Sequence, residues 1–343
     1  MIYINLLIVF IIIVFIHEYG HYLSARFFKA KITDFSIGFG KPLVQFIDKN
    51  GTNWKISPIP LGGYVKIKGL DTIFQKNQGI EEEGSFQSLK LYQKIIILLA
   101  GSVFNIFSAW IVLLFFYFLI GIKSISPEIG EVQKNSAADS SGILKGDIIL
   151  SVNDIKIKKF GDIPKAIGGN EYIFLELLRD NSIVKKNIQL KFDRKLNRKI
   201  IGITSTSNIV NDQFNFISSL KESLYFIPNY YYLSYKFIIQ SFNDNTLTEQ
   251  LAGPIGIVKM ADQMMLDKIA GVILLFVIIS LFVGLFNLMP IPLLDGGHIL
   301  YFIIRRIFSN SLPDFVTRVY LAVGITIISF IFIVVTYNDI FYK

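Results

Sequence analysis

The sequence has 343 residues, of which 52% are hydrophobic, and its mean hydropathy of +0.52 indicates several membrane spans rather than a water-soluble fold. The absence of cysteine excludes disulfides, thiol catalysis and cysteine metal ligands. The formal net charge is +8, but the basic residues are dispersed along the chain, so the charge does not indicate a nucleic-acid partner.

Four stretches without charged residues are candidates for membrane-spanning helices. They are Met1–Ile16, Ile95–Ile122, Ile269–Leu294 and Val319–Asn338. A span needs about 20 apolar residues, so the last three suffice alone, and the first suffices only if it continues into the residues that follow. A signal peptide is the alternative for the first stretch, but it lacks a basic beginning and a small-residue cleavage site.

The first span continues directly into "HEYGH", which contains His17, Glu18 and His21. Histidines four residues apart lie on one face of a helix and can hold one metal ion, and the glutamate beside them is typical of a general base. The alternative is a polar cluster that pairs with another helix. Charged groups at membrane depth cost roughly 2.5–3.5 kcal/mol each on insertion scales, so three ionisable residues together favour the metal site.

Residues 33–68 alternate apolar and polar side chains and contain Asn50-Gly51, a strong hairpin signal. A small soluble hairpin is the alternative interpretation. Because this segment directly follows the motif helix, we expect a sheet that dips into the membrane surface beside the site.

The composition from about Ile125 to Thr204 is that of a water-soluble domain. Its segment "SGILKGDIIL" resembles the turn and strand of PDZ domains, and the matching residues are Gly142, Ile143, Gly146, Asp147 and Ile148. PDZ domains bind peptide ends by adding a strand to a sheet edge, so the resemblance implies such a partner. A purely structural insertion is the alternative.

Residues 214–242 mix aromatic and charged side chains around Pro228, which favours helices lying at the membrane interface. A fifth span is the alternative, but it would bring Asp295 to the membrane face opposite His17. The excess of Lys and Arg after the first span, before the second, and between the third and fourth predicts that these loops are cytoplasmic. The N-terminus, the segment 123–268 and the C-terminus are then outside.

A catalytic zinc site usually has three protein ligands, so the two histidines need a partner from elsewhere. The segment "FNLMPIPLLDGGHIL" supplies two candidates, Asp295 and His298. Pro290 and Pro292 interrupt the helix there, which is tolerated only where the backbone lines a protein or water-filled cavity.

These segments together resemble the site-2 proteases, and most closely the bacterial branch that contains the regulator-of-sigma-E protease. The shared motifs are "HEYGH", "PLGGYVK", "AGSVFN", "LAGPIGIVK" and "NLMPIPLLDGGH". The resemblance implies one zinc ion held by His17, His21 and Asp295, with Glu18 as catalytic base and His298 not a ligand. It also implies an often duplicated PDZ domain, whereas about 80 residues here have room for one.

A membrane-spanning substrate is helical and must unwind before its carbonyls can be attacked. The strands at 33–68, with Gly62 and Gly63 of "PLGGYVK", are candidates to accept the unwound segment as an added strand. Asn287, Pro290 and Pro292 at the helix break and Asn105 in the second span are further candidates for substrate binding. Helix packing through side-chain hydrogen bonds is the alternative role for Asn105 and Asn287.

The predicted fold is an α-helical polytopic membrane protein with four transmembrane helices, a membrane-associated β-hairpin sheet and one inserted PDZ domain. The expected divisions are a first span with HExxH at 1–30, the β-region on the cytoplasmic side at 31–90, a second span at 91–122, the periplasmic PDZ domain at 123–206, interfacial helices at 207–268, a third span with NxxPxPxLDGG at 269–300, a cytoplasmic loop at 301–318 and a fourth span at 319–338.

The predicted function is zinc-dependent hydrolysis of peptide bonds inside the spans of single-span membrane proteins. Such substrates are anti-sigma-factor-like proteins or remnant signal peptides, already shortened by another protease in regulated intramembrane proteolysis. The expected location is a bacterial inner membrane, with membrane lipid as a partner and the site toward the cytoplasm. The alternatives are a non-catalytic PDZ scaffold, which needs no metal, a transporter, which should show an inverted repeat, and an aspartyl protease, which needs a second membrane aspartate.

Overall fold

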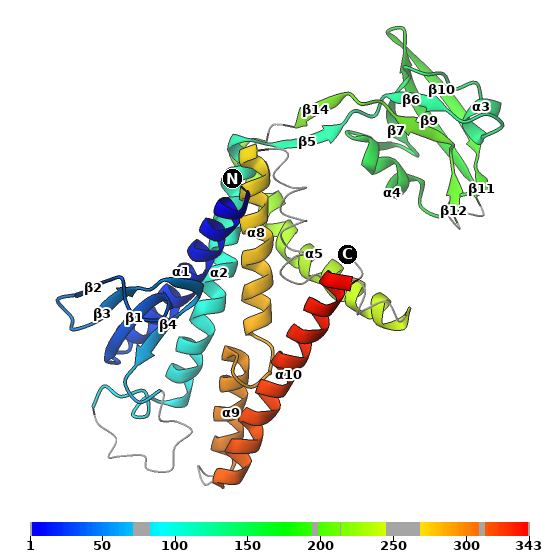
Figure 1. Cartoon of the computed structure of the whole chain (residues 1–343). Coiled ribbons are helices and arrows are strands. Elements are labelled where there is room, and N and C mark those ends of the chain that lie inside the picture. The colour runs from blue at the N-terminus through cyan, green and yellow to red at the C-terminus, as the bar shows by residue number, and fades with distance from the viewer. Residues whose placement is uncertain are drawn as a thin grey trace. The chain divides into compact units, whose positions relative to one another are not determined.

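The computed structural model describes residues 2–70, 83–193, 198–212, 214–244, 268–308 and 313–341. The chain divides into two compact units, one made of residues 1–116 with 216–343 and the other of residues 117–215. Each unit has its own secondary structure and its own core (Figure 1).

The first unit contains four long apolar helices. They are α1 (Ile2–Phe27), α2 (Leu91–Leu119), α8 (Lys268–Asn287) and α10 (Asp314–Phe341). Each contains a segment long and apolar enough to cross a membrane, and among the described residues these are the four candidate spans. Only 6% of the apolar window of α10 is buried within the protein, so lipid is the natural environment of its surface. The chain is thus a polytopic membrane protein, as predicted.

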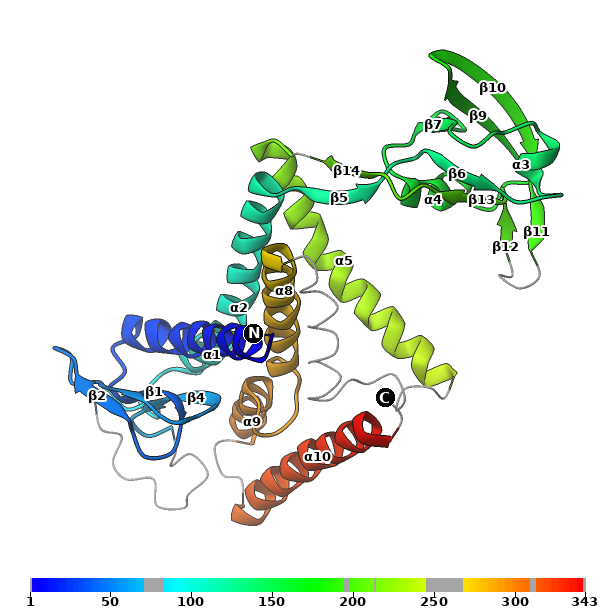
Figure 2. The same cartoon turned by 45° about the horizontal axis from the view of Figure 1, so that its top comes forward.

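Helices α1, α2 and α8 pack against one another (Figure 1), with α1 crossing the other two in the turned view (Figure 2), and small residues allow their close approach. A Cβ atom on Gly20 of α1 would lie 2.5 Å from the Ala100 carbonyl oxygen of α2, and one on Gly284 of α8 would lie 3.2 Å from the Ser102 carbonyl oxygen. In a membrane, such contacts replace the hydrophobic effect as the force that holds helices together.

The segment after α1 forms a four-stranded sheet from β1 (Ile32–Phe39), β2 (Val44–Ile47), β3 (Asn53–Ile56) and β4 (Ile59–Ile67) in the order β2-β3-β1-β4. Strands β1 and β3 are parallel, and the other pairs are antiparallel. The hairpin signal Asn50-Gly51 lies between β2 and β3, where Gly51 has φ of 80°. Whether this sheet touches the membrane surface stays a prediction.

The loop between β2 and β3 is held by the carboxylate of Asp48. Its Oδ1 accepts hydrogen bonds from the backbone amides of Asn50 and Thr52, at 2.8 and 2.9 Å. Burial raises the pKa of Asp48, but hydrogen bonds from Trp54, Thr52 and Asn50 outweigh it and lower the pKa to about 2. The sheet then packs on the membrane helices through a core that includes Phe35, Ile67, Phe86, Ile97 and Phe302.

The chain after α8 is interrupted at the expected prolines and then forms a further helix. Helix α8 ends at Asn287, and a new helix α9 runs from Asp295 to Ile307. Part of the segment 301–318 is thus helical, while its cytoplasmic position stays a prediction. Helix α9 continues because one face buries Tyr301 and Phe302, while its last turn carries Arg305 and Arg306 at the end where cations are favoured.

Helix α5 (Phe216–Asn243) falls in the region expected to hold interfacial helices, and it contains Pro228. It meets α8 through a hydrogen bond from the Tyr231 hydroxyl to the Leu281 carbonyl, at 3.1 Å. Among the described residues, α5 is not one of the candidate spans. The rest of the predicted interfacial region, 245–267 with the motif "LAGPIGIVK", lies outside the described residues, and its interfacial position stays a prediction.

The second unit is built from short strands around one apolar core. The strands are β5 (Ile122–Ile125), β6 (Ile129–Val132), β7 (Ile148–Val152), β8 (Ile155–Lys156), β9 (Tyr172–Arg179), β10 (Ser182–Gln189), β11 (Lys191–Asp193), β12 (Arg198–Ile200), β13 (Ile203–Ser205) and β14 (Ile209–Asp212). The largest sheet has the order β10-β9-β7-β8, and β5 pairs with β14 where the chain enters and leaves the unit. The short helices are α3 (Ala137–Ser140), η1 (Phe160–Asp162) and α4 (Ile163–Ile167).

The turn "GILKGD" before β7 explains the motif that suggested a PDZ domain. Gly142 and Gly146 have φ of 68° and 89°, a conformation that favours glycine. Asp147 is buried, and its carboxylate accepts hydrogen bonds from the Leu144 amide at 2.9 Å and from the Arg179 guanidinium at 2.7 Å. Burial raises the pKa of Asp147, but the hydrogen bonds from Arg179 and Leu144 outweigh it, so the net pKa is lowered.

Replacing Asp147 with Asn is expected to loosen the second unit, because it leaves the partly buried Arg179 charge without its carboxylate. The cost should be roughly 3 kcal/mol in the free energy of opening of β7 and β9, measured by hydrogen exchange on the full chain. A lowered folded-state pKa stabilises the fold above the unfolded-state pKa, so the effect should be full above about pH 4 and shrink as the pH falls further. Glu171→Gln, an exposed carboxylate, is the control, and equal protection in both variants would contradict this role.

Candidate metal centre and active site

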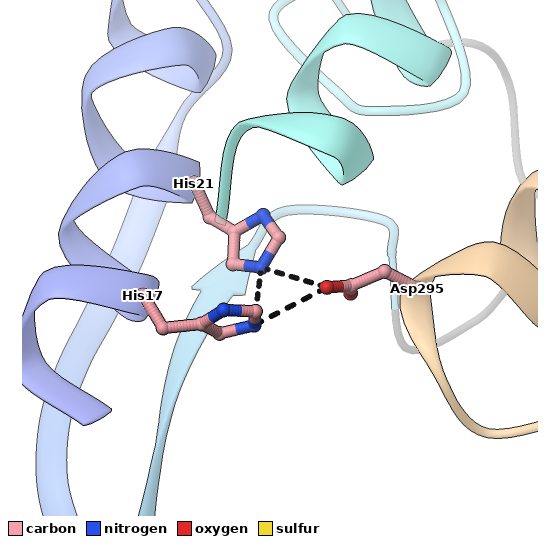
Figure 3. Close-up of side chains that lie close together, drawn as sticks. All are labelled: His17, His21 and Asp295. Atoms are coloured by element: carbon pink, nitrogen blue, oxygen red, sulfur yellow. Dashed lines mark hydrogen bonds and ion pairs between the residues drawn. The ribbon is translucent and has the colours of Figure 1, made fainter. Parts of the chain in front are cut away.

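Helix α1 brings the first two candidate ligands together. His17 and His21 lie one turn apart on the face of α1 that meets α2, and each is 8% exposed. Asp295 is the first residue of α9, directly after the chain segment that interrupts the apolar helix. The three side chains converge from these two elements (Figure 3).

The ligand atoms form a nearly equilateral triangle. The Nε2 atoms of His17 and His21 are 3.2 Å apart, and Oδ2 of Asp295 lies 3.2 Å from the first and 3.4 Å from the second. Zinc ligands at about 2.0–2.2 Å in tetrahedral geometry lie about 3.3–3.6 Å from one another. The spacing therefore fits three ligands of one zinc ion.

A second observation supports the same fit. Oδ2 of Asp295 is buried and accepts no well-aligned hydrogen bond; its neighbours are the Nε2 atoms of the two histidines, and a buried carboxylate oxygen without a donor is costly. A cation in the triangle satisfies it. Among the described residues, His17, His21 and Asp295 are the one group of at least three such side chains with ligand atoms this close.

His298, the other candidate for the third ligand, is not part of this group. Its Nδ1 lies 2.9 Å from the carbonyl oxygen of Leu294 in the preceding turn. The geometry thus brings Asp295, and not His298, to the histidines of α1.

The glycines of "DGGH" and of "AGSVFN" make room for the centre. A Cβ atom on Gly296 would lie 2.2 Å from the Leu288 carbonyl oxygen, and one on Gly297 would lie 2.0 Å from that of Ile291, so only glycine fits beneath the loop. On α2, a Cβ atom on Gly101 would lie 2.4 Å from Nε2 of His21 and 2.8 Å from Cε1 of His17. Helix α2 can therefore pass directly beside both imidazole rings.

Helix α2 also contacts the outer nitrogens of both rings. Nδ1 of His21 lies 2.8 Å from the Ile97 carbonyl oxygen, and Nδ1 of His17 lies 3.4 Å from the side-chain nitrogen of Asn105. A carbonyl only accepts, so Nδ1 of His21 carries the proton and Nε2 is left as an acceptor for a metal.

The centre opens into a cavity of about 760 Å³ in the first unit. Glu18 lines it beside His17, His21 and Asp295, and the backbone amide of Val65 faces the Glu18 carboxylate. Two carboxylates in one cavity balance the charge of a divalent ion.

Strand β4 forms one wall of this cavity through Gly62, Gly63, Tyr64 and Val65. It is an edge strand among the described strands. Its pairing with β1 jumps from Gly63 to Ile59, so the residues between them have no partner on β1. A Cβ atom on Gly63 would lie 3.1 Å from Cγ of Glu18, which places the strand directly against the expected base.

The candidates for substrate binding divide into two groups. Gly62, Gly63 and Asn287 line the cavity, and the Asn287 amide lies 3.3 Å from Nε2 of His17. Pro290, Pro292 and Asn105 are not among the lining residues. Pro292 is buried, and its ring approaches Gly324 of α10, where a Cβ atom would lie 2.4 Å away.

Sequence reasoning missed three supporting features: the Ile97 carbonyl, Gly101 and the Val65 amide. Two of these are backbone groups, which leave no residue-type signal. Gly101 stands inside "AGSVFN", where a small residue one turn before a buried asparagine is a signal of close helix packing.

Comparison with known proteins supplies the wider context. Residues 5–331 match the family model described as Peptidase family M50. The chain is 33% identical to "Putative zinc metalloprotease RC0203" of Rickettsia conorii, over 98% of each chain. It is 32% identical to "Putative zinc metalloprotease Cj1068" of Campylobacter jejuni, over 96% of this chain and 90% of that protein.

Among solved structures, the PDZ domain of the SdrC-like protein Lin2157 from Listeria innocua covers 24% of this chain and 96% of that one, at 20% identity and a TM-score of 0.22. The family match and the two relatives, by contrast, extend over nearly the whole chain and include the elements that carry the centre. The chain therefore belongs to peptidase family M50, the site-2 proteases, and is a zinc metalloprotease.

Proposed function

We propose that His17, His21 and Asp295 hold the zinc ion and that Glu18 is the general base of an intramembrane endopeptidase. The single observation that carries the proposal is the triangle of ligand atoms 3.2–3.4 Å apart beside Glu18 in one cavity. When bound there, zinc supplies a Lewis acid that lowers the pKa of water and polarises a peptide carbonyl.

The residues of the chain then have separate tasks. Glu18 takes a proton from the attacking water and later gives it to the leaving amine, as a general acid and base. The Val65 amide orients the Glu18 carboxylate, and Gly63 leaves space for that side chain. The buried position of the centre between α1, α2 and α9 excludes bulk water from the reacting groups.

The cavity wall supports hydrolysis of an unwound segment. A substrate helix has its carbonyls hydrogen-bonded, so it must become extended to be attacked. The edge of β4, with an interrupted pairing beside Gly62 and Gly63, offers free backbone groups to an added strand. We infer that the substrate strand lies along β4, with its scissile bond between Glu18 and the ligand triangle.

Asn287 is the further substrate contact that the geometry supports. Its amide now lies 3.3 Å from Nε2 of His17, which is a ligand atom in the proposed centre. With that nitrogen bound to a metal, the amide needs another acceptor, and a substrate carbonyl in the same cavity provides one. Pro290 and Pro292 instead shape the loop that delivers Asp295.

The second unit is proposed to be a PDZ domain, supported by its "GILKGDI" turn and its small strand-and-helix core. A cavity of about 220 Å³ lies between α4 and the chain around β13. Its apolar lining residues include Phe160, Ile163, Ile167, Ile201 and Ile203. Lys199 also lines it and can pair with a carboxylate. This suits an apolar peptide end.

We propose that the PDZ domain lies outside an inner membrane and hinders intact substrates, so that single-span proteins shortened by another protease are cleaved in regulated intramembrane proteolysis. The charge distribution of the loops supports this sidedness. The bacterial relatives and the four candidate spans fit an inner membrane location.

Changing Glu18 to Gln tests the catalytic assignment. Cleavage of a single-span substrate in detergent should fall about 100- to 10,000-fold, because a carboxamide cannot take the proton. Bound zinc should stay near one per chain, whereas His17→Ala should lose it. Glu131→Gln, an exposed change in the second unit, is the control. Wild-type cleavage by Glu18→Gln would contradict the assignment.

Changing Asn287 to Ala tests substrate contact. We expect kcat/KM to fall about 100-fold with zinc retained, because the donor to the substrate carbonyl is lost. Asn5→Ala, an amide elsewhere on the membrane helices, is the matched control. Loss of bound zinc in Asn287→Ala, together with an equal fall in kcat/KM for a substrate span that already contains a helix-breaking residue, would contradict substrate contact. Asn287 would then support the metal site.

Removing the second unit tests its role as a filter. The Ser126 amide donates to the Asn208 carbonyl at 2.9 Å, so a short glycine linker can replace residues 127–207 while β5 and β14 stay paired. Cleavage of an intact single-span protein should rise at least tenfold relative to its shortened form. Lys199→Glu, which reverses the charge at the α4 cavity, separates peptide binding from obstruction. An unchanged preference after the deletion would refute the filter.

A further inference from the structure

The outer nitrogen of His17 faces a side chain whose role the proposed function leaves open. Asn105 of α2 is fully buried, and its carboxamide nitrogen lies 3.4 Å from Nδ1 of His17. Its oxygen Oδ1 is buried without a hydrogen-bond partner. One buried amide thus has an orphaned acceptor directly beside an imidazole nitrogen.

The neighbouring histidine shows what such a contact achieves. The Ile97 carbonyl of the same helix lies 2.8 Å from Nδ1 of His21, which fixes the proton on that nitrogen and leaves Nε2 free. A half-turn of the Asn105 carboxamide exchanges its nitrogen and oxygen, bringing Oδ1 to Nδ1 of His17. Both histidines would then donate from Nδ1 to an oxygen of α2.

We propose that Asn105 is a positioning residue whose carboxamide oxygen accepts the Nδ1 proton of His17 and so presents Nε2 of that ring to zinc. The inference rests on the proposed zinc site. A metal-bound histidine needs an acceptor for its second ring nitrogen, and such acceptors fix both the tautomer and the orientation of the ring.

The surroundings of Asn105 favour this role over substrate binding. Asn105 has no exposed surface and is not among the residues that line the cavity. Its own carbonyl accepts hydrogen bonds from Ser280 of α8 at 3.0 Å and from Ser108 at 2.9 Å, which hold this turn of α2 in place. The residue is therefore fixed from one side and turned toward the histidine on the other.

Two substitutions separate the acceptor from packing. Asn105→Leu keeps the size and removes the acceptor, whereas Asn105→Asp keeps an oxygen at the same place. Ser102→Ala, on the same buried stretch of α2, is the matched control because its hydroxyl has no hydrogen-bond partner. Zinc affinity of the full chain in detergent, measured by chelator competition, is the first readout.

We expect Asn105→Leu to weaken zinc binding about 10- to 100-fold, and Asn105→Asp to retain most of the wild-type affinity. The proposal is overturned if Asn105→Leu binds zinc as tightly as the wild type, or if Asp and Leu weaken it equally. His17→Ala distinguishes failure of the zinc site from failure of the positioning role. If His17→Ala binds zinc as tightly as the wild type, the proposed zinc site is wrong. If His17→Ala loses zinc affinity but Asn105→Leu does not, only the positioning role is wrong.

The small number of histidines gives a direct second readout. The chain has three histidines, so ring-nitrogen labelling yields three resolvable side chains by NMR. In the zinc-loaded wild type, His17 and His21 should both carry a protected proton on Nδ1. In Asn105→Leu the His17 proton should lose its protection, while the His21 signal, held by Ile97, reports that the helices remain packed. An unchanged His17 signal would refute the inference.

Discussion

The structure of the membrane unit depends on one constraint: three ligand atoms from two distant segments of the chain must lie 3.2–3.4 Å from one another. Two come from a single turn of α1, and the third comes from the first residue of α9. The chain solves this by ending α8 at Asn287 and starting a new helix at Asp295, so that a helix beginning rather than a helix side faces the histidines.

The same constraint explains why small residues surround the centre. Gly101 lets α2 pass beside the rings, and Gly296 and Gly297 let α9 start beneath the loop that follows α8. These positions form no bond to the metal, yet a methyl group at any of them would collide with a ring or a carbonyl. Close backbone approach also brings carbonyls within reach, as the contact between Ile97 and His21 shows. Packing and ligand orientation are therefore two results of one arrangement.

The sequence allowed prediction of the parts that follow a local rule. The period of the helix places His17 and His21 together, the hydropathy identifies four spans, and Asn50-Gly51 marks the turn between β2 and β3. The third ligand could be narrowed to Asp295 or His298 but was chosen only through family resemblance. The helix α9 after residue 300 was missed, because its amphipathic pattern becomes meaningful only once Tyr301 and Phe302 are seen packed. The contacts of Asn105 with Nδ1 and of Asn287 with Nε2 of His17 were equally hidden, since residue type alone does not tell which side of His17 an amide faces.

Hydrolysis inside a membrane requires that water and an extended peptide reach a place built to exclude both. The apolar outer surface of α10 faces lipid, whereas the polar groups of α1, α2 and α9 face one another and the cavity. An edge strand is normally a liability because its free backbone groups attract other chains. In the proposed function that property becomes useful, because β4 is an edge strand of its sheet, within the described part of the chain, and lines the cavity. In the proposed function, catalytic and substrate-pairing groups share one wall. A Cβ atom on Gly63 would lie 3.1 Å from Cγ of Glu18, so a strand bound along β4 also has its scissile bond beside the base.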